Sequence, residues 1–379
     1  MKKEIYLDNS ATTPVCKSAL ENAVFAMTEE WGNPSALYVK GMNAETLLSK
    51  TREKVANYIN ARPDEIFFTG CGTESNNTAI FGAVAKLRKR CNRVVTSVVE
   101  HPSVKEPMKR LEEEGVEVIY LPVNQEGKEE IDALRQAITE KTMLVSLMAV
   151  NNETGAIQPI DKVREIIREK NSPALFHCDA VQAFGKMPLD VKALGVDMMS
   201  ISGHKVHAPK GVGVLYKKKE LALPSFLLGG GQEKGFRSGT EAVPLIWALK
   251  GAVEELGNPR ETLKSITELN AYAKEKLSSL DGVYINSPED ALPYILNISV
   301  TGYRSEILLH FLEAAGIYVS SGSACSKGMQ SGVLGAMGLP NSRTDSALRI
   351  SMSRDTTRED IDALAEGLLK AQSKLRKVK

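Results

Sequence analysis

Short apolar runs alternate with amphipathic segments through the first part of the chain. The apolar runs predict seven strands, at residues 66–69, 94–99, 116–121, 143–150, 174–178, 196–201 and 212–216. Apolar residues at helical spacing predict helices at 44–59, 74–90, 103–114, 130–138 and 160–169. Near-continuous apolar strands that alternate with helices indicate an α/β fold with a mainly parallel sheet covered on both faces.

The pattern changes after a predicted helix at residues 241–256. Gly257 and Pro259 are typical of a helix stop, and a long charged helix follows them. Shorter strands are predicted around 294–300 and 317–320, with a closing helix from 358 to about 375. We therefore expect a large domain at residues 14–257 and a smaller α+β domain at 258–379. The first thirteen residues are too few to fold alone and are expected to pack on the smaller domain.

Composition and charge restrict the class of protein. A chain of 379 residues exceeds the size of a single core, and 42% hydrophobic with 25% charged residues is ordinary for a globular protein. The 48 basic and 47 acidic residues leave a net charge of +1, which argues against nucleic acid or a membrane as partner. Neither a spanning segment nor a signal peptide is predicted, so we expect a cytoplasmic protein.

The five cysteines separate into one unusual residue and four ordinary ones. They show no CxxC pair and no spacing that predicts a metal site. Cys16, Cys71, Cys91 and Cys178 are interpreted as packing residues, and all five as free thiols of a reducing compartment. Cys325 instead lies in a segment of glycine, serine and alanine, which predicts a flexible loop.

Lys205 follows the apolar run 196–201, in the tetrapeptide Ser202-Gly203-His204-Lys205. A lysine that ends a buried strand in a polar pocket is partly desolvated, which lowers the pKa of its amine and makes it a nucleophile toward an aldehyde. Proteins hold pyridoxal phosphate in this way. A surface lysine is the commoner reading of one residue alone, but Ser202 and His204 both suit a phosphate.

Other strand ends carry groups that suit the same cofactor. Gly72 and Thr73 lie between a predicted strand and helix, where backbone N–H groups and a hydroxyl can approach a phosphate. Asp179 ends another strand and could keep a pyridine nitrogen protonated, with Gln182 on the same face to donate to the ring phenolate. An ordinary strand-to-helix turn and a helix-capping aspartate remain the alternatives.

Three further residues suit a substrate or a proton transfer. His101 stands between a predicted strand and helix, where an imidazole could stack on a ring and move protons, or serve only the structure. Asn152 follows the strand ending at 150, and its amide suits a carboxylate. Arg349 lies in an apolar strand and pairs either with a substrate carboxylate or with a protein carboxylate.

Taken in order, ten motifs resemble those of the cysteine desulfurases of the NifS/IscS type. They stand at residues 7–14, 32–35, 72–76, 100–101, 151–155, 177–182, 202–205, 237–240, 321–325 and 348–351. The resemblance extends from about Tyr6 to the last helix. It implies the fold type I architecture of pyridoxal-phosphate-dependent class V aminotransferases, a homodimer, and conversion of L-cysteine to L-alanine with the sulfur carried away as a persulfide.

The resemblance also implies a role for each matching residue. Lys205 would bond the cofactor, His101 would stack on its ring as an acid or base, and Cys325 would be the sulfur nucleophile on a long mobile loop. The expected cofactor contacts are Gly72, Thr73, Ser202 and His204 at the phosphate, Asp179 at the pyridine nitrogen, Gln182 at the phenolate, and Thr240 reaching the neighbouring subunit's phosphate. Asn152 and Arg349 would bind the substrate. No metal is expected.

Two departures from the family leave the sulfur acceptor open. The stretch from Cys325 to the helix-like residues 333–339 is shorter than in housekeeping members, and the sequence ends at Lys379 without their extension. The sequence is therefore compatible with an iron–sulfur scaffold, a tRNA-thiolation protein or another sulfur carrier as the sulfur acceptor. The alternative activities are selenocysteine lyase or another lyase or aminotransferase of this fold. A non-catalytic relative would lack the lysine or the cysteine, and this chain has both.

Overall fold

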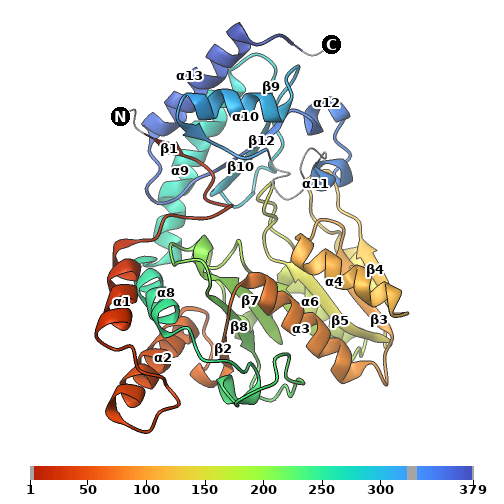
Figure 1. Cartoon of the computed structure of the whole chain (residues 1–379). Helices are drawn as coiled ribbons and strands as arrows, with labels where there is room; N and C mark the ends of the chain where they lie inside the picture. Colours follow the sequence, from red (N-terminus) through yellow and green to blue (C-terminus); the bar gives the residue numbers. More distant parts are fainter. Residues whose placement is uncertain (1–3, 322–330, 378–379) are drawn as a thin grey trace.

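The computed structural model describes residues 4–321 and 331–377. Its large lobe is built on a seven-stranded sheet (Figure 1). The strands follow the spatial order β2 (Ile66–Thr69), β8 (Gly213–Lys217), β7 (Met198–Ser202), β6 (Leu175–Asp179), β5 (Thr142–Met148), β3 (Arg93–Ser97) and β4 (Glu117–Leu121). Strand β8 is antiparallel to both neighbours, so the other strands share one direction. The predicted mainly parallel α/β sheet is confirmed.

Helices cover both faces of this sheet because its strands are buried on both sides. One face packs against α1 (Lys17–Thr28), α2 (Val39–Tyr58), α5 (Ile131–Ala137), α6 (Ile160–Glu169), α7 (Val191–Leu194) and α8 (Val243–Glu255). The other face packs against α3 (Gly72–Leu87) and α4 (Pro102–Glu113). None of the helices that the structure describes is long and apolar enough to cross a membrane.

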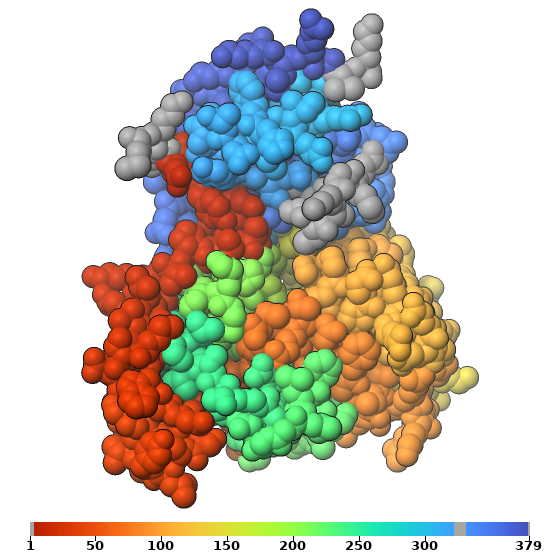
Figure 2. Space-filling model, viewed as in Figure 1, coloured from red at the N-terminus to blue at the C-terminus, as the bar shows by residue number. Residues whose placement is uncertain are grey.

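The small lobe contains an antiparallel sheet in the order β12 (Ala347–Ser351), β10 (Ile295–Val300) and β9 (Val283–Ile285). Around it pack α9 (Pro259–Ser278), α10 (Ser305–Ala314) and α13 (Arg358–Lys374), with the short helices α11 (Gly332–Ala336) and α12 (Asn341–Thr344) beside them. Strand β1 (Ile5–Tyr6) pairs with β11 (Ile317–Tyr318), so the N-terminal segment reaches the small lobe (Figure 2).

The division into domains stays a proposal. Separate hydrophobic clusters in the two lobes support it. However, Ile266, Leu292 and Tyr294, which we assigned to the smaller domain, pack in the main cluster of the large lobe. The apolar core therefore continues across the boundary that we drew near residue 257.

Helices α1 and α10 were not predicted, and α1 shows why. Its buried side chains are the small Ala19, Ala23 and Ala26, which lie close to α8. Its large apolar residues are exposed instead, at Leu20, Val24, Phe25 and Met27, with 42% to 58% of each accessible to solvent. A helix with its large apolar residues on the outside does not have the pattern of a helix that packs on a core.

Candidate active site

A cavity of about 580 Å³ lies where several strands of the large sheet end and the small lobe begins. Polar groups at the ends of parallel strands meet at one edge of a sheet, where α/β proteins bind ligands. Most of the predicted site residues line this cavity: Gly72, Thr73, His101, Asn152, Asp179, Gln182, Ser202, His204, Lys205 and Arg349. Thr240 and Cys325 are treated separately below.

Lys205 lies in a single helical turn directly after β7. Its ammonium donates hydrogen bonds to the backbone carbonyls of Ser10 and Ala11, the latter over 2.7 Å. The N-terminal segment therefore reaches the lysine from the other end of the chain. The next residues continue this contact, since Thr13 N–H donates to the carbonyl of His204 over 3.0 Å.

Asp179 is the last residue of β6 and is 5% exposed. Its Oδ1 accepts from Val181 N–H at 3.0 Å and its Oδ2 from Asn76 Nδ2 at 2.7 Å. Neither donor carries a charge, and burial raises the pKa of this carboxyl. A buried carboxylate held by neutral donors would be stabilised by a cationic N–H in the cavity.

The start of α3 forms the wall opposite Ser202. The N–H groups in the first turn of a helix have no partner within the helix, so Gly72 and Thr73 present free donors. A Cβ atom on Gly72 would lie 2.8 Å from Val181 Cγ2 and 3.3 Å from Ser202 Cβ, so this position requires glycine. The Ser202 hydroxyl is buried and has no hydrogen-bond partner among the described residues.

His204 stands beside these donors and is neutral at ordinary pH. Burial, together with the nearby charges of Lys205 and Lys210, lowers the pKa of its imidazole to about 4. Its Nδ1 lies 3.2 Å from the hydroxyl of Thr12. Together with Ser202 and the first turn of α3, it forms a group of donors that suits a phosphate.

Gln182 is held by a buried lysine that sequence reasoning missed. Lys186 Nζ donates to Gln182 Oε1 over 3.0 Å, and Gln182 Nε2 donates to the carbonyl of Ser10 over 3.0 Å. Burial, together with the charges of Lys205 and Arg349, lowers the pKa of Lys186 to about 7. The spacing of four residues was the available signal, because such residues are neighbours on one helical turn.

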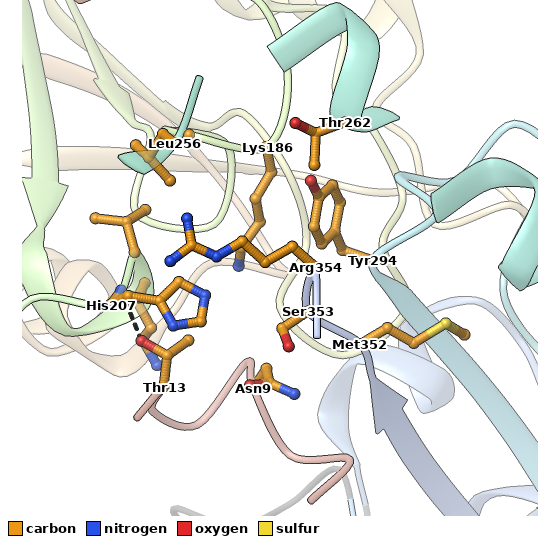
Figure 3. A pocket seen from close by; sticks show the side chains of 13 residues that line it. Asn9, Thr13, Lys186, His207, Leu256, Thr262, Tyr294, Met352, Ser353 and Arg354 are labelled. Atoms are coloured by element: carbon orange, nitrogen blue, oxygen red, sulfur yellow. Dashed lines mark hydrogen bonds between the residues drawn. The ribbon is translucent and has the colours of Figure 1, made fainter. Parts of the chain in front are cut away.

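Lys186 also lines a smaller cavity of about 30 Å³ between the lobes (Figure 3). His207 and Arg354 surround the same space. Arg354 forms an ion pair with Glu255 at the end of α8, with an N···O distance of 2.6 Å. Thr13 Oγ1 accepts from His207 N–H over 2.7 Å. Contacts of the N-terminal segment and of Arg354 thus connect the two lobes around this smaller cavity, which Lys186 and Lys205 both line.

Arg349 lies in β12 and satisfies one of its two predicted roles. Its Nη2 pairs with Asp8 Oδ1 at 2.7 Å, and its Nη1 donates to the carbonyl of Asn152 over 3.0 Å. The expected protein ion pair is therefore present. Its Nε is buried without a partner among the described residues, so one N–H of the guanidinium is still available to a carboxylate.

Cys325 lies outside the described residues. The described residues that precede and follow residues 322–330 line the cavity or bond to residues of its wall. Ser320 exchanges two backbone hydrogen bonds with Arg349, and Gly332 and Val333 line the cavity directly. The Ser331 hydroxyl donates to Glu153, another residue of the cavity wall.

Thr240 is exposed and lines a different pocket, together with Trp31 and residues 32–34. It does not join the lysine within one chain. This is the arrangement required of a residue that would act in a neighbouring subunit. The described residues contain no group of three or more His, Cys, Asp or Glu that could hold a metal ion.

Comparisons with protein-family models, with other sequences and with solved structures each match nearly the whole chain and indicate related proteins. The model of the aminotransferase class-V family matches residues 5–364. A cysteine desulfurase IscS from Methanosarcina thermophila is 40% identical over 378 residues, which cover 99% of this chain and 93% of that protein. A solved NifS-like protein has a TM-score of 0.92 at 38% identity, covering 98% of this chain and 100% of the other. SspA, solved in complex with cysteine, has a TM-score of 0.82 at 32% identity over 94% of this chain and 100% of the other.

Proposed function

The chain belongs to the aminotransferase class-V family, and we propose that it is a cysteine desulfurase that converts L-cysteine to L-alanine and retains the sulfur as a persulfide on Cys325. The observation that supports this most directly is that Lys205, Asp179 and His101 line one cavity. Overall, L-cysteine and the Cys325 thiol give L-alanine and the Cys325 persulfide, so atoms and electrons balance without an external oxidant.

The cofactor is pyridoxal phosphate, and the residues of the cavity fit it. Lys205 would hold its aldehyde, Asp179 its pyridinium nitrogen and Gln182 its phenolate oxygen. The unpartnered hydroxyl of Ser202, the neutral His204 and the first turn of α3 would hold its phosphate. When bound, the protonated ring withdraws electrons from the substrate and so supports the loss of a proton from the substrate's alpha carbon.

The protein's own groups then have separate tasks. Asp179 keeps the pyridine nitrogen protonated, because a buried carboxylate favours a cation beside it. Arg349 and Asn152 orient the substrate carboxylate at the small-lobe side of the cavity. The Cys325 thiolate attacks the substrate sulfur, because a thiolate is the nucleophilic form of cysteine. The hydrogen bonds of Ser320 to Arg349 and of Ser331 to Glu153, both residues of the cavity wall, support this assignment.

The other activities of this fold are not favoured. Selenocysteine lyases and aminotransferases need no cysteine at position 325, whereas the relatives at about 40% identity are named cysteine desulfurases. The sulfur acceptor is proposed as a class only, a protein of iron–sulfur cluster assembly or of tRNA or cofactor thiolation. A cytoplasmic location remains a prediction, with four described cysteines present as free thiols.

Purified protein supplied with pyridoxal phosphate, L-cysteine and a reductant is expected to release alanine and sulfide in equal amounts. The reductant regenerates the Cys325 thiol, so turnover continues. Amino-acid analysis and a sulfide assay measure the two products. Pyruvate and ammonia in place of alanine would contradict the proposal, because they would indicate elimination of the sulfur without a protein nucleophile.

We propose that the enzyme is a homodimer formed through the surface of α1 and residues 31–42. The large apolar side chains of this surface are exposed, including Trp31 at 66%, Leu37 at 97% and Val39 at 69%. Soluble monomers rarely expose a contiguous apolar patch of this kind. Thr240 lies beside Trp31, so a second copy seated there would bring Thr240 of each chain toward the other.

The Leu37→Glu variant is therefore expected to sediment as a monomer and to lose cofactor affinity. A buried, unpaired carboxylate destabilises an apolar interface, and separation removes Thr240 from the neighbouring phosphate site. Thr240→Ala should weaken cofactor binding without dissociating the dimer. Leu369→Glu is the control, because Leu369 is 51% exposed on α13, away from this surface. A wild-type monomer with full cofactor occupancy would rule out the shared site.

A further inference from the structure

A chain of hydrogen bonds connects Asp179 to His101 through Asn76 and Ser103. Asn76 Nδ2 donates to Asp179 Oδ2 over 2.7 Å and to Ser103 Oγ over 2.8 Å. Ser103 Oγ lies 2.8 Å from His101 Nδ1. Asn76 is 1% exposed and Ser103 8%, so the two contacts of Asn76 are buried, and the contact of Ser103 with His101 is partly buried at the cavity wall.

The Asn76 amide in this chain has one favoured orientation. An amide nitrogen donates only, so both hydrogens of Asn76 Nδ2 are used, one at Asp179 and one at Ser103. A flipped amide would place Asn76 Oδ1 against the Asp179 carboxylate, which is repulsive. Since Ser103 Oγ accepts from Asn76, its own hydrogen is available for His101 Nδ1.

A second donor reaches the same ring nitrogen. His101 is the N-cap of α4, and its Nδ1 accepts from Ser103 N–H over 3.1 Å. Nδ1 therefore faces one N–H, one O–H and the positive end of a twelve-residue helix. A hydrogen on Nδ1 would face these donors directly, so the neutral ring carries its hydrogen on Nε2.

We propose that Asn76 and Ser103 are positioning residues that hold His101 as the neutral imidazole with its hydrogen on Nε2. In this form His101 donates a hydrogen bond from the ring nitrogen that points away from α4. It accepts a proton only after the Ser103 contacts open. His101 is then not the base that removes the first proton from the substrate, and a different group of the cavity has that task.

The charged groups around the ring agree with a neutral imidazole. Burial lowers the pKa of His101, and Lys205 after β7 and Lys105 on α4 lower it further. Asp179 on β6 acts in the opposite direction. Glu100, the residue before His101, is buried, and burial raises the pKa of its carboxyl well above the ordinary value, which weakens its tendency to hold a charge beside the ring. A helix N-terminus is known to keep a histidine neutral in this way.

The test is the tautomer itself, measured by two-bond ¹H–¹⁵N correlation spectra of protein labelled with ¹⁵N-histidine. His101→Gln identifies the signals of His101. In wild-type protein we expect a bare Nδ1 and a protonated Nε2 across the range in which free histidine titrates, about pH 5 to 8. Signals of a protonated Nδ1 in the neutral ring would overturn the proposal without any variant.

Two variants test the positioning residues. In Ser103→Ala and Asn76→Ala the Nδ1 and Nε2 shifts should approach each other, as in a mixture of tautomers, and the His101 titration should move toward about 6.5. Ser103→Thr keeps the hydroxyl and should restore the wild-type spectrum. Unchanged His101 signals in both alanine variants would overturn their role.

Thr78→Val is the matched control on the same helix. The Thr78 hydroxyl is buried and has no hydrogen-bond partner within residues 4–321 and 331–377, so its removal should leave the His101 signals unchanged and should not lower the free energy of unfolding. The inference rests on the proposed function in one respect, since it assumes that the cofactor binds beside His101. The spectra can be recorded on cofactor-free protein, so a protein with the expected tautomer that releases no alanine would count against the proposed function alone.

Discussion

Lys205→Ala is expected to abolish alanine release from L-cysteine and to remove the borohydride-reducible link between protein and cofactor. The amine of Lys205 lies in the cavity beside Asp179, Ser202 and the start of α3, and we assign it the covalent contact with the cofactor. Removal of a residue that forms a covalent bond during catalysis typically costs about 10⁴-fold or more. Reduction with borohydride followed by peptide mapping measures the link, and amino-acid analysis measures alanine.

Lys186 provides the control for this experiment. Its side chain is buried against Gln182, a predicted cofactor contact, and the charge of Lys205 contributes to its lowered pKa. Lys186→Met should keep the reducible link at Lys205, because the substitution leaves the Lys205 amine and its contacts with Ser10 and Ala11 in place. A reducible adduct that persists in Lys205→Ala, with the label on the peptide of Lys186, would show that the wrong lysine was assigned.

Cys325→Ser is expected to bind pyridoxal phosphate and to change its absorbance on addition of L-cysteine, yet to release neither alanine nor sulfide. Binding and the first proton transfers depend on Lys205, Asp179 and their neighbours, which the substitution leaves in place. A serine hydroxyl stays protonated at neutral pH and forms no persulfide. Mass spectrometry of wild-type protein after cysteine treatment should find one added sulfur on the peptide that contains Cys325.

The other cysteines provide matched controls. Burial raises the pKa of Cys16, Cys91 and Cys178, so these thiols remain protonated and unreactive. Cys71 is the sharpest control, because it lines the same cavity as Lys205. Cys71→Ser should retain alanine release within a few-fold of wild type. Added sulfur on the Cys71 peptide, or wild-type alanine release from Cys325→Ser, would refute the assignment of the nucleophile.

Local sequence patterns were sufficient for most of the large lobe. Helix α6 has the predicted bounds, and the seven predicted strands are those of the sheet within a few residues. Side chains placed at strand ends, such as Asp179, could be expected to meet because parallel strands end at one edge. The same reasoning could not find α1, since its large apolar residues face outward and only small alanines face the core.

The sequence by itself was enough to predict which residues would carry the chemistry, because each short motif contains a lysine, a carboxylate or a histidine of the type that the cofactor requires, and the structure places most of them around one cavity. Only the tertiary structure decided how these groups are held. Asp8 pairs with Arg349 across 341 positions, Ser10 offers its carbonyl to both Lys205 and Gln182, and Asn76 joins Asp179 to Ser103. Periodicity reports only on neighbours within a helix or strand, whereas the protonation and orientation of a buried group depend on partners that folding brings from distant segments.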